Sequence, residues 1–154
     1  MTHPLRICGL AAGLFFLSPV AEASPVGLWK TFDDDTGQAK ALVAIKEERG
    51  ALSGRIVRLL DPADAPDSRC DACPDERRGQ PLVGLLILRN VAPQGAPDTW
   101  AGGDILDPED GKLYRVQLKL SPDNQKLDVR GYIGTPLLGR TQTWQRAEEP
   151  RALR

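Results

Sequence analysis

The chain has 154 residues, of which 41% are hydrophobic and 27% are charged, and its formal net charge is −1. This length suits one domain with a substantial core, and the balanced charge excludes a basic surface that would bind nucleic acid by counterion release. The single histidine is His3. Catalytic triads and metal sites that need an imidazole are therefore excluded for the rest of the chain.

The first residues have the pattern of a secretory signal peptide. Arg6 provides the positive charge, and residues 7–17 form an apolar run of the usual length. Ala21 and Ala23 are small residues at the two positions that a signal peptidase reads, which predicts cleavage after Ala23. An uncleaved anchor is the alternative, but the run is shorter than the about 20 residues that a transmembrane helix needs. We therefore expect a cleaved signal peptide over 1–23, an exported protein and no transmembrane segment in the mature chain.

From Val26 onward, short apolar segments with a period of two alternate with turn residues, which indicates antiparallel strands. One such segment, 82–88, is continuously apolar and also fits a short buried helix, but its shortness between Pro81 and Asn90 favours a strand. The strands are expected over 26–32, 40–47, 52–60, 82–88, 100–106, 112–120, 126–133 and 138–146.

About eight strands with no long amphipathic helix predict an all-β fold. A chain of short antiparallel strands closes into a small barrel or packs as two sheets, and we favour the barrel. Closure also removes the exposed edges that invite aggregation. The barrel domain is expected over 24–147, and a polar tail over 148–154.

The longest irregular stretch, 61–81, contains the pair Cys70 and Cys73. Two cysteines at this spacing in an oxidising compartment are expected to form a disulfide that stiffens the loop. A redox-active pair is the alternative, although it would need a preceding strand and a following helix, and nearby acidic residues disfavour a thiolate. A metal site would need two further soft or imidazole ligands, which the mature chain lacks, so no metal is predicted.

Three adjacent aspartates, Asp33 to Asp35, precede Thr36 and Gly37. Their carboxylates could suit calcium, but a calcium loop needs spaced ligands and usually a distant bidentate glutamate. An aspartate run before a glycine is typical of a solvated β-turn, which is the interpretation we favour.

The first and last expected strands carry Gly27-x-Trp29 and Arg146. This arrangement resembles the calycin superfamily, which includes lipocalins, fatty-acid-binding proteins and avidins. The resemblance implies a calycin-like barrel in which Trp29 packs against Arg146 and closes one end. A guanidinium over a desolvated indole contributes about 1–2 kcal/mol. A buried tryptophan of any β domain is the alternative.

A second resemblance covers nearly the whole chain after the signal peptide. After the G-x-W and C-x-x-C motifs, the chain continues with motifs at Pro81–Leu88, Trp100–Tyr114, Val129–Gly134 and Gly139–Trp144. Together they resemble the family called domain of unknown function 2147, whose members are small exported bacterial proteins. The resemblance implies a compact periplasmic β domain and no particular activity.

The candidate ligand-binding residues are polar side chains on neighbouring strands: Tyr114, Arg130, Tyr132, Arg140 and Gln142. If these side chains face the lumen, the arginines suit a carboxylate or phosphate, whereas on the outer face they are only solvated. We expect a protein that binds a small amphipathic or anionic ligand without a cofactor. An interaction module of the cell envelope that uses 61–81 is the alternative. A thiol- or carboxylate-based enzyme fits least, and no catalytic residue is identified.

Overall fold

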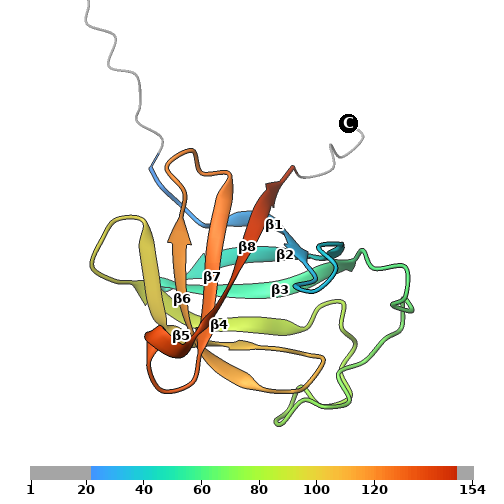
Figure 1. Cartoon of the computed structure of the whole chain (residues 1–154). Helices are drawn as coiled ribbons and strands as arrows, with labels where there is room; N and C mark the ends of the chain where they lie inside the picture. Colours follow the sequence, from blue (N-terminus) through green and yellow to red (C-terminus); the bar gives the residue numbers. More distant parts are fainter. Residues whose placement is uncertain (1–21, 149–154) are drawn as a thin grey trace, which may run out of the picture.

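The structure, a computed structural model, describes residues 22–148, which form eight strands and one short 3-10 helix (Figure 1). The elements are β1 Gly27–Phe32, β2 Ala39–Glu48, β3 Ala51–Leu59, β4 Leu86–Pro93, β5 Thr99–Leu106, β6 Leu113–Leu120, β7 Lys126–Tyr132, η1 Pro136–Leu138 and β8 Arg140–Ala147. Nearly all of the expected signal peptide and most of the expected tail lie outside the described residues. None of the helices within 22–148 is long and apolar enough to cross a membrane.

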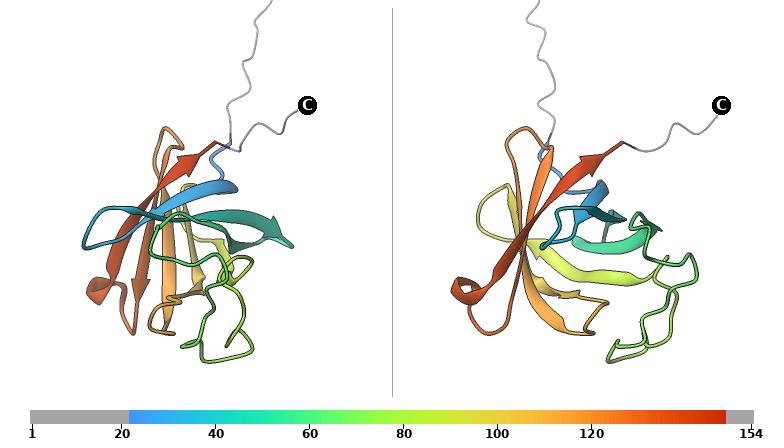
Figure 2. Two further views of the ribbon diagram at one scale, coloured as in Figure 1. Left: turned by 90° about the vertical axis from the view of Figure 1, so that its right-hand side faces the viewer. Right: turned by 45° about the vertical axis from the view of Figure 1, so that its right-hand side comes forward.

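The eight strands form one closed antiparallel barrel. Each strand pairs with the next along the chain, and β8 pairs back with β1, where Trp29 is the partner of Arg146. Figures 1 and 2 show the first and last strands side by side, so the sheet has no free edge there. The predicted all-β antiparallel barrel of about eight strands is confirmed, and the two-sheet alternative is excluded.

The core consists of the inward-facing residues of each strand. In β6, Val116, Leu118 and Leu120 are buried, whereas the alternate residues Arg115 and Lys119 are exposed. Burial of one such side chain contributes roughly 1.5–3 kcal/mol. Because a slip of one residue would turn all of these side chains outward, the apolar alternation also determines the register of the barrel.

The segment 82–88 differs from its prediction. A turn, in which Leu85 N donates to Leu82 O over 3.1 Å, precedes β4, which begins only at Leu86. Gly84 adopts a φ of 93° in this turn, a conformation that glycine reaches without steric cost. Asn90 does not end the strand as expected but lies inside β4, with a left-handed φ of 56° that asparagine tolerates. The alternative of a short helix is excluded.

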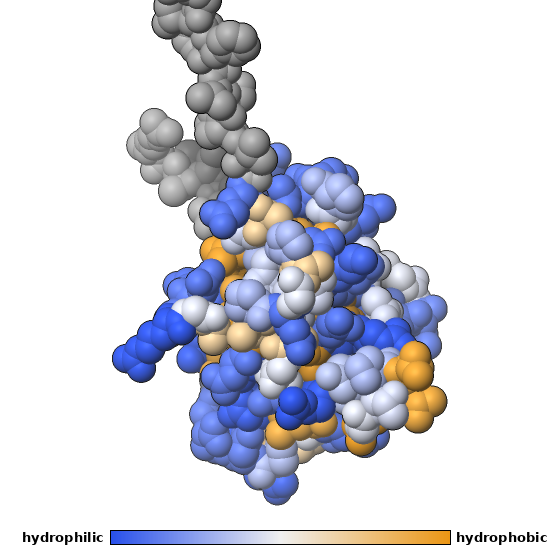
Figure 3. All heavy atoms as spheres, turned by 90° about the vertical axis from the view of Figure 1, so that its left-hand side faces the viewer, coloured by the Kyte–Doolittle hydropathy of each residue, from blue (hydrophilic) through white to orange (hydrophobic). Residues whose placement is uncertain are grey.

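The last strand begins later than predicted, at Arg140. The preceding residues form η1, in which Thr135 Oγ1 accepts a hydrogen bond from Leu137 N over 3.1 Å and Pro136 presets the backbone φ. This places Leu137 and Leu138 on the surface, 89% and 82% exposed. The face drawn in Figure 3 is mainly hydrophilic, with hydrophobic groups in small separate patches.

Candidate functional site: a cavity at one end of the barrel

One end of the barrel is sealed by an arginine stacked on an indole. The guanidinium carbon of Arg146 lies 4.3 Å from the ring centroid of Trp29, and the Trp29 side chain is fully buried. The indole Nε1 donates to Pro25 O over 2.8 Å. The guanidinium donates to the backbone carbonyls of three residues around it, Ser24, Val26 and Asn124. The polar atoms of this end therefore have partners within the chain.

Gly27 is required for this closure. Its φ is 134°, and a Cβ atom at this position would lie only 2.8 Å from Arg146 Nη1. A side chain at position 27 would displace the guanidinium from Trp29. Because the guanidinium is partly buried, burial lowers the pKa of Arg146. The structure thus explains why the G-x-W motif begins with glycine, which the sequence alone did not reveal.

The opposite end of the barrel is open and contains a cavity of about 640 Å³. This volume lies within the range of about 300–1,000 Å³ that is typical of small-molecule sites. The floor is formed by inward-facing apolar side chains, among them Val43, Ile56, Ile87, Leu106, Val129 and Trp144. The rim comes from the β1–β2 turn, the 61–81 loop and the β5–β6 turn. A second hollow, of about 390 Å³, lies on the outer face of β2–β4, where Lys46 and Arg55 line it.

The five candidate binding residues divide into two groups. Tyr114, Arg140 and Gln142 line the cavity, whereas Arg130 and Tyr132 do not. The lumen-facing alternative therefore applies to Tyr114, Arg140 and Gln142, and Arg130 and Tyr132 lie outside this cavity.

The register of β7 and β8 explains this division. Val129 pairs with Gln142 and Gly131 pairs with Arg140, so these residues face inward. Arg130 is the partner of Thr141, donates to its Oγ1 over 2.8 Å, and donates to a carbonyl of η1. Its side chain therefore supports the β7–β8 connection outside the cavity.

The basic side chains at the rim already have partners. Arg140 forms an ion pair with Asp34, and Lys40 forms ion pairs with Glu109 and, over 3.8 Å, with Asp33. The third cation, Arg69, belongs to the 61–81 loop, and its Nη1 donates to a loop carbonyl over 2.9 Å. An anionic ligand would have to compete with these partners.

Asp33 organises the β1–β2 turn. Its Oδ1 accepts hydrogen bonds from the backbone N and the Oγ1 of Thr36 over 2.8 and 2.9 Å. These bonds, the largest being that from the Thr36 backbone, lower the pKa of Asp33. The aspartate run therefore forms a β-turn, as the favoured interpretation expected. Within residues 22–148, no three His, Cys, Asp or Glu side chains are grouped so as to hold a metal ion.

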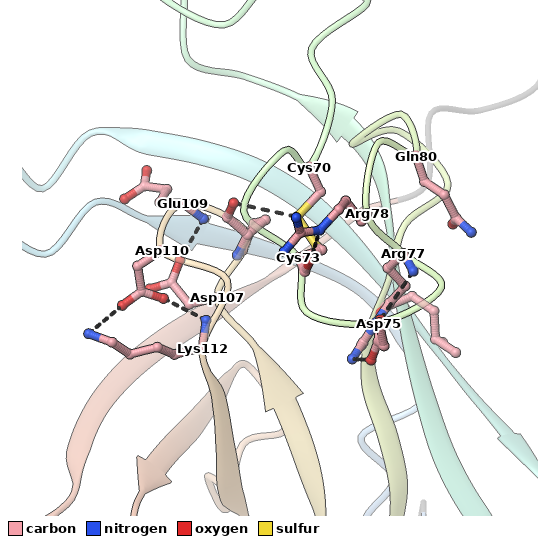
Figure 4. Close-up of a disulfide and its surroundings, with 12 residues drawn as sticks. Cys70, Cys73, Asp75, Arg77, Arg78, Gln80, Asp107, Glu109, Asp110 and Lys112 are labelled. Carbon is pink, nitrogen blue, oxygen red and sulfur yellow. Dashed lines mark hydrogen bonds and ion pairs between the residues drawn. A yellow bond between two sulfur atoms is a disulfide. The ribbon is translucent and has the colours of Figure 1, made fainter.

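The 61–81 loop folds against the rim of the cavity and is braced by its cysteines. Cys70 and Cys73 are joined by a disulfide, and both are fully buried. Cys70 Sγ lies 3.6 Å from Pro108 O, and Figure 4 shows the disulfide beside the turn that carries Asp107, Glu109 and Asp110. The disulfide therefore lies where the loop meets the β5–β6 turn.

Arg77 anchors the same loop to the barrel, a role that no sequence motif indicated. Its side chain is only 3% exposed, donates to both carboxylate oxygens of Asp75 over 2.8 and 2.6 Å, and donates to Leu86 O over 2.9 Å. The hydrogen bonds from Arg77 lower the pKa of Asp75 to about 2. Leu86 begins β4, so this pair connects the loop to the start of the strand.

Burial affects two polar groups at the open end. Partial burial, with a contribution from the nearby charge of Asp110, raises the pKa of Asp107. The same two causes, burial first, raise the pKa of Tyr114, whose hydroxyl donates to Asp110 Oδ2 over 3.4 Å. Both groups line the cavity, and the nearby carboxylate of Asp110 contributes to both shifts.

The fold places this barrel among known proteins. A solved structure described as "Protein HP1028 from the human pathogen Helicobacter pylori belongs to the lipocalin family" matches with a TM-score of 0.70 and 21% identity, covering 82% of this chain and 85% of that one. At this identity the likeness concerns the fold, which is a lipocalin-like barrel. The family described as "Uncharacterized protein conserved in bacteria (DUF2147)" matches residues 27–146, and the chain belongs to this family. Comparison with curated proteins finds no match.

Proposed function

We propose that this protein binds a small amphipathic ligand in the cavity at the open end of its barrel. The observation that carries the proposal is the cavity of about 640 Å³ with an apolar floor and a polar rim. A barrel filled by its own side chains would leave no such space. The combination of apolar walls with a few polar groups is typical of small-molecule sites.

Three of the candidate residues have suitable positions for binding. Trp144, 2% exposed, supplies a large apolar surface at the floor, and its Nε1 donates to Gln142 Oε1 over 3.2 Å. This bond leaves the amide N–H groups of Gln142 as donors for a ligand. The Tyr114 hydroxyl and the Arg140 guanidinium complete the polar set at the rim. Arg130 and Tyr132 have no part in the proposed site, because they do not line it.

We place this binding in the periplasm. The proposal is supported by the signal-peptide pattern over 1–23 and by the Cys70–Cys73 disulfide, which suits an oxidising compartment. The mass of the protein recovered from the periplasm tests this, and a chain that starts at Ser24 is the expected result. A full-length chain in the cytoplasm would contradict it.

A pair of variants on one strand tests the binding site. Ala41 is buried and lines the cavity, whereas Ala44 faces outward on the same strand. With n-decanol as the probe and tryptophan fluorescence as the readout, Ala41→Phe should weaken binding by about tenfold or more, because the ring occupies the cavity. Ala44→Phe adds the same ring outside and should bind as the parent does. Equal binding by both variants, with both folded by circular dichroism, would overturn the proposal.

A further inference from the structure

The proposed cavity has a marked excess of negative charge at its rim. Seven carboxylates line it, from Asp33 to Asp35 in the β1–β2 turn, from Asp64 and Asp71 in the long loop, and from Asp107 and Glu109 in the β5–β6 turn. Only Lys40, Arg69 and Arg140 oppose them. A cleft lined mainly by one sign of charge concentrates ligands of the opposite sign.

On this basis we infer that the ligand is a cationic amphiphile, an apolar body with an amine or similar positive headgroup. The inference rests on the proposed function, because it assigns a charge to the ligand of that same cavity. It reverses the expectation of an anionic ligand that the arginines suggested from the sequence.

The ion pairs at the rim support a positive charge on the ligand. The three basic side chains already have partners, since Arg140 and Lys40 form ion pairs with carboxylates and Arg69 donates to a carbonyl. Four of the lining carboxylates form no ion pair with any described residue: Asp35, Asp64, Asp71 and Asp107. The uncompensated charge at the rim is therefore negative.

The cavity also offers aromatic surfaces that favour a cation. Tyr114 and Trp144 both line it, and the negative face of an aromatic ring attracts an ammonium group within about 6 Å. An apolar ligand body displaces water from the floor, which strengthens the attraction between a bound ammonium group and the carboxylates above it. The aromatic lining is thus compatible with the positive headgroup that the carboxylates favour.

Three probes with the same alkyl chain separate the effect of ligand charge from the binding of the alkyl chain in the cavity. n-Decylamine, n-decanol and n-decanoate at neutral pH and low salt carry a positive, neutral and negative head, and titration calorimetry measures each. We expect decylamine to bind about tenfold or more tightly than decanoate, with decanol between them. Added salt should reduce the difference, because it screens the rim charges. Equal or tighter binding of decanoate would overturn the inference but leave the proposed function standing, whereas binding of none of the three would overturn both.

Variants that remove carboxylate charges then test whether the rim causes the preference for decylamine. Asp64→Asn with Asp71→Asn should weaken decylamine binding several-fold and leave decanol binding unchanged. The matched control is Glu47→Gln with Glu48→Gln, which removes the same charge at the closed end of the barrel. If both pairs change decylamine binding equally, or neither does, the ligand is not recognised by the rim carboxylates and the inference fails.

Discussion

The closed and open ends of the barrel are formed by the same eight strands but are filled in opposite ways. At the closed end, the Arg146 guanidinium stacks on Trp29 and donates to three backbone carbonyls. At the open end, carboxylates without an ion pair surround a cavity of about 640 Å³. Groups that are satisfied within the chain stabilise the fold, whereas unpaired groups around a cavity are available to a ligand. The two ends should therefore respond differently to substitution.

The largest expected effect is at the closed end. Trp29→Ala removes a fully buried indole and the surface on which Arg146 stacks. We expect the free energy of unfolding to fall by about 3–5 kcal/mol in urea titrations, as for other large-to-small core changes. Leu28→Ala, on the outward face of the same strand, is the control and should cost much less. A loss below about 1 kcal/mol for Trp29→Ala would show that this end does not depend on the indole.

The next largest effect concerns the anchor of the long loop. Arg77→Met removes the hydrogen bonds to Asp75 and to Leu86 O, and leaves this carboxylate without its main partner. We expect a loss of about 1–3 kcal/mol of stability, together with faster hydrogen exchange in the 61–81 loop. Arg78→Met is a suitable control, because Arg78 is exposed and donates only to Cys73 O. If exchange in the loop is unchanged by Arg77→Met, the loop is held by other contacts.

A glycine pair measures the contact between this loop and the β5–β6 turn. Gly111 has a φ of 70°, and a Cβ atom there would lie against Ala72 O, whereas Gly37 has a φ of 71° and open space around it. Both Gly→Ala variants carry the same backbone strain, of about 1–2 kcal/mol, but only Gly111→Ala also pushes the loop away. Thermal unfolding should show the larger loss for Gly111→Ala. Equal losses would mean that the loop does not pack on the turn.

The smallest expected effect is a pH dependence of stability. The folded-state pKa of Asp75 is lowered to about 2 from an ordinary value of 3.8, so its contribution is complete above pH 3.8 and is lost as the pH falls toward 2. Because the side chain is 25% exposed, we expect about 1 kcal/mol. Asp75→Asn should remove this part of the acid sensitivity in urea titrations between the two pH values. If the free energy of unfolding of Asp75→Asn changes with pH as steeply as that of the parent, other carboxylates control the acid sensitivity.

The fold could be predicted from local patterns because alternation records which face of a strand is buried. The strands expected over 100–106 and 112–120 each lie within one residue of β5 and β6. The start of β4 could not be predicted, because a continuous apolar run has no period. The site was predicted only in part, because whether Arg130 or Arg140 faces inward depends on the register of β7 against β8.

The amino-acid sequence by itself determined the all-β class and the approximate strands, because these follow from local periodicity and turn chemistry. Only the tertiary structure decided which polar residues share the cavity and which charges remain unpaired. Strand pairing and the folding of the 61–81 loop bring together groups far apart in the chain, such as Asp34 with Arg140 and Lys40 with Glu109. The sign of the charge at the open end depends on those long-range pairs, and no local pattern contains it.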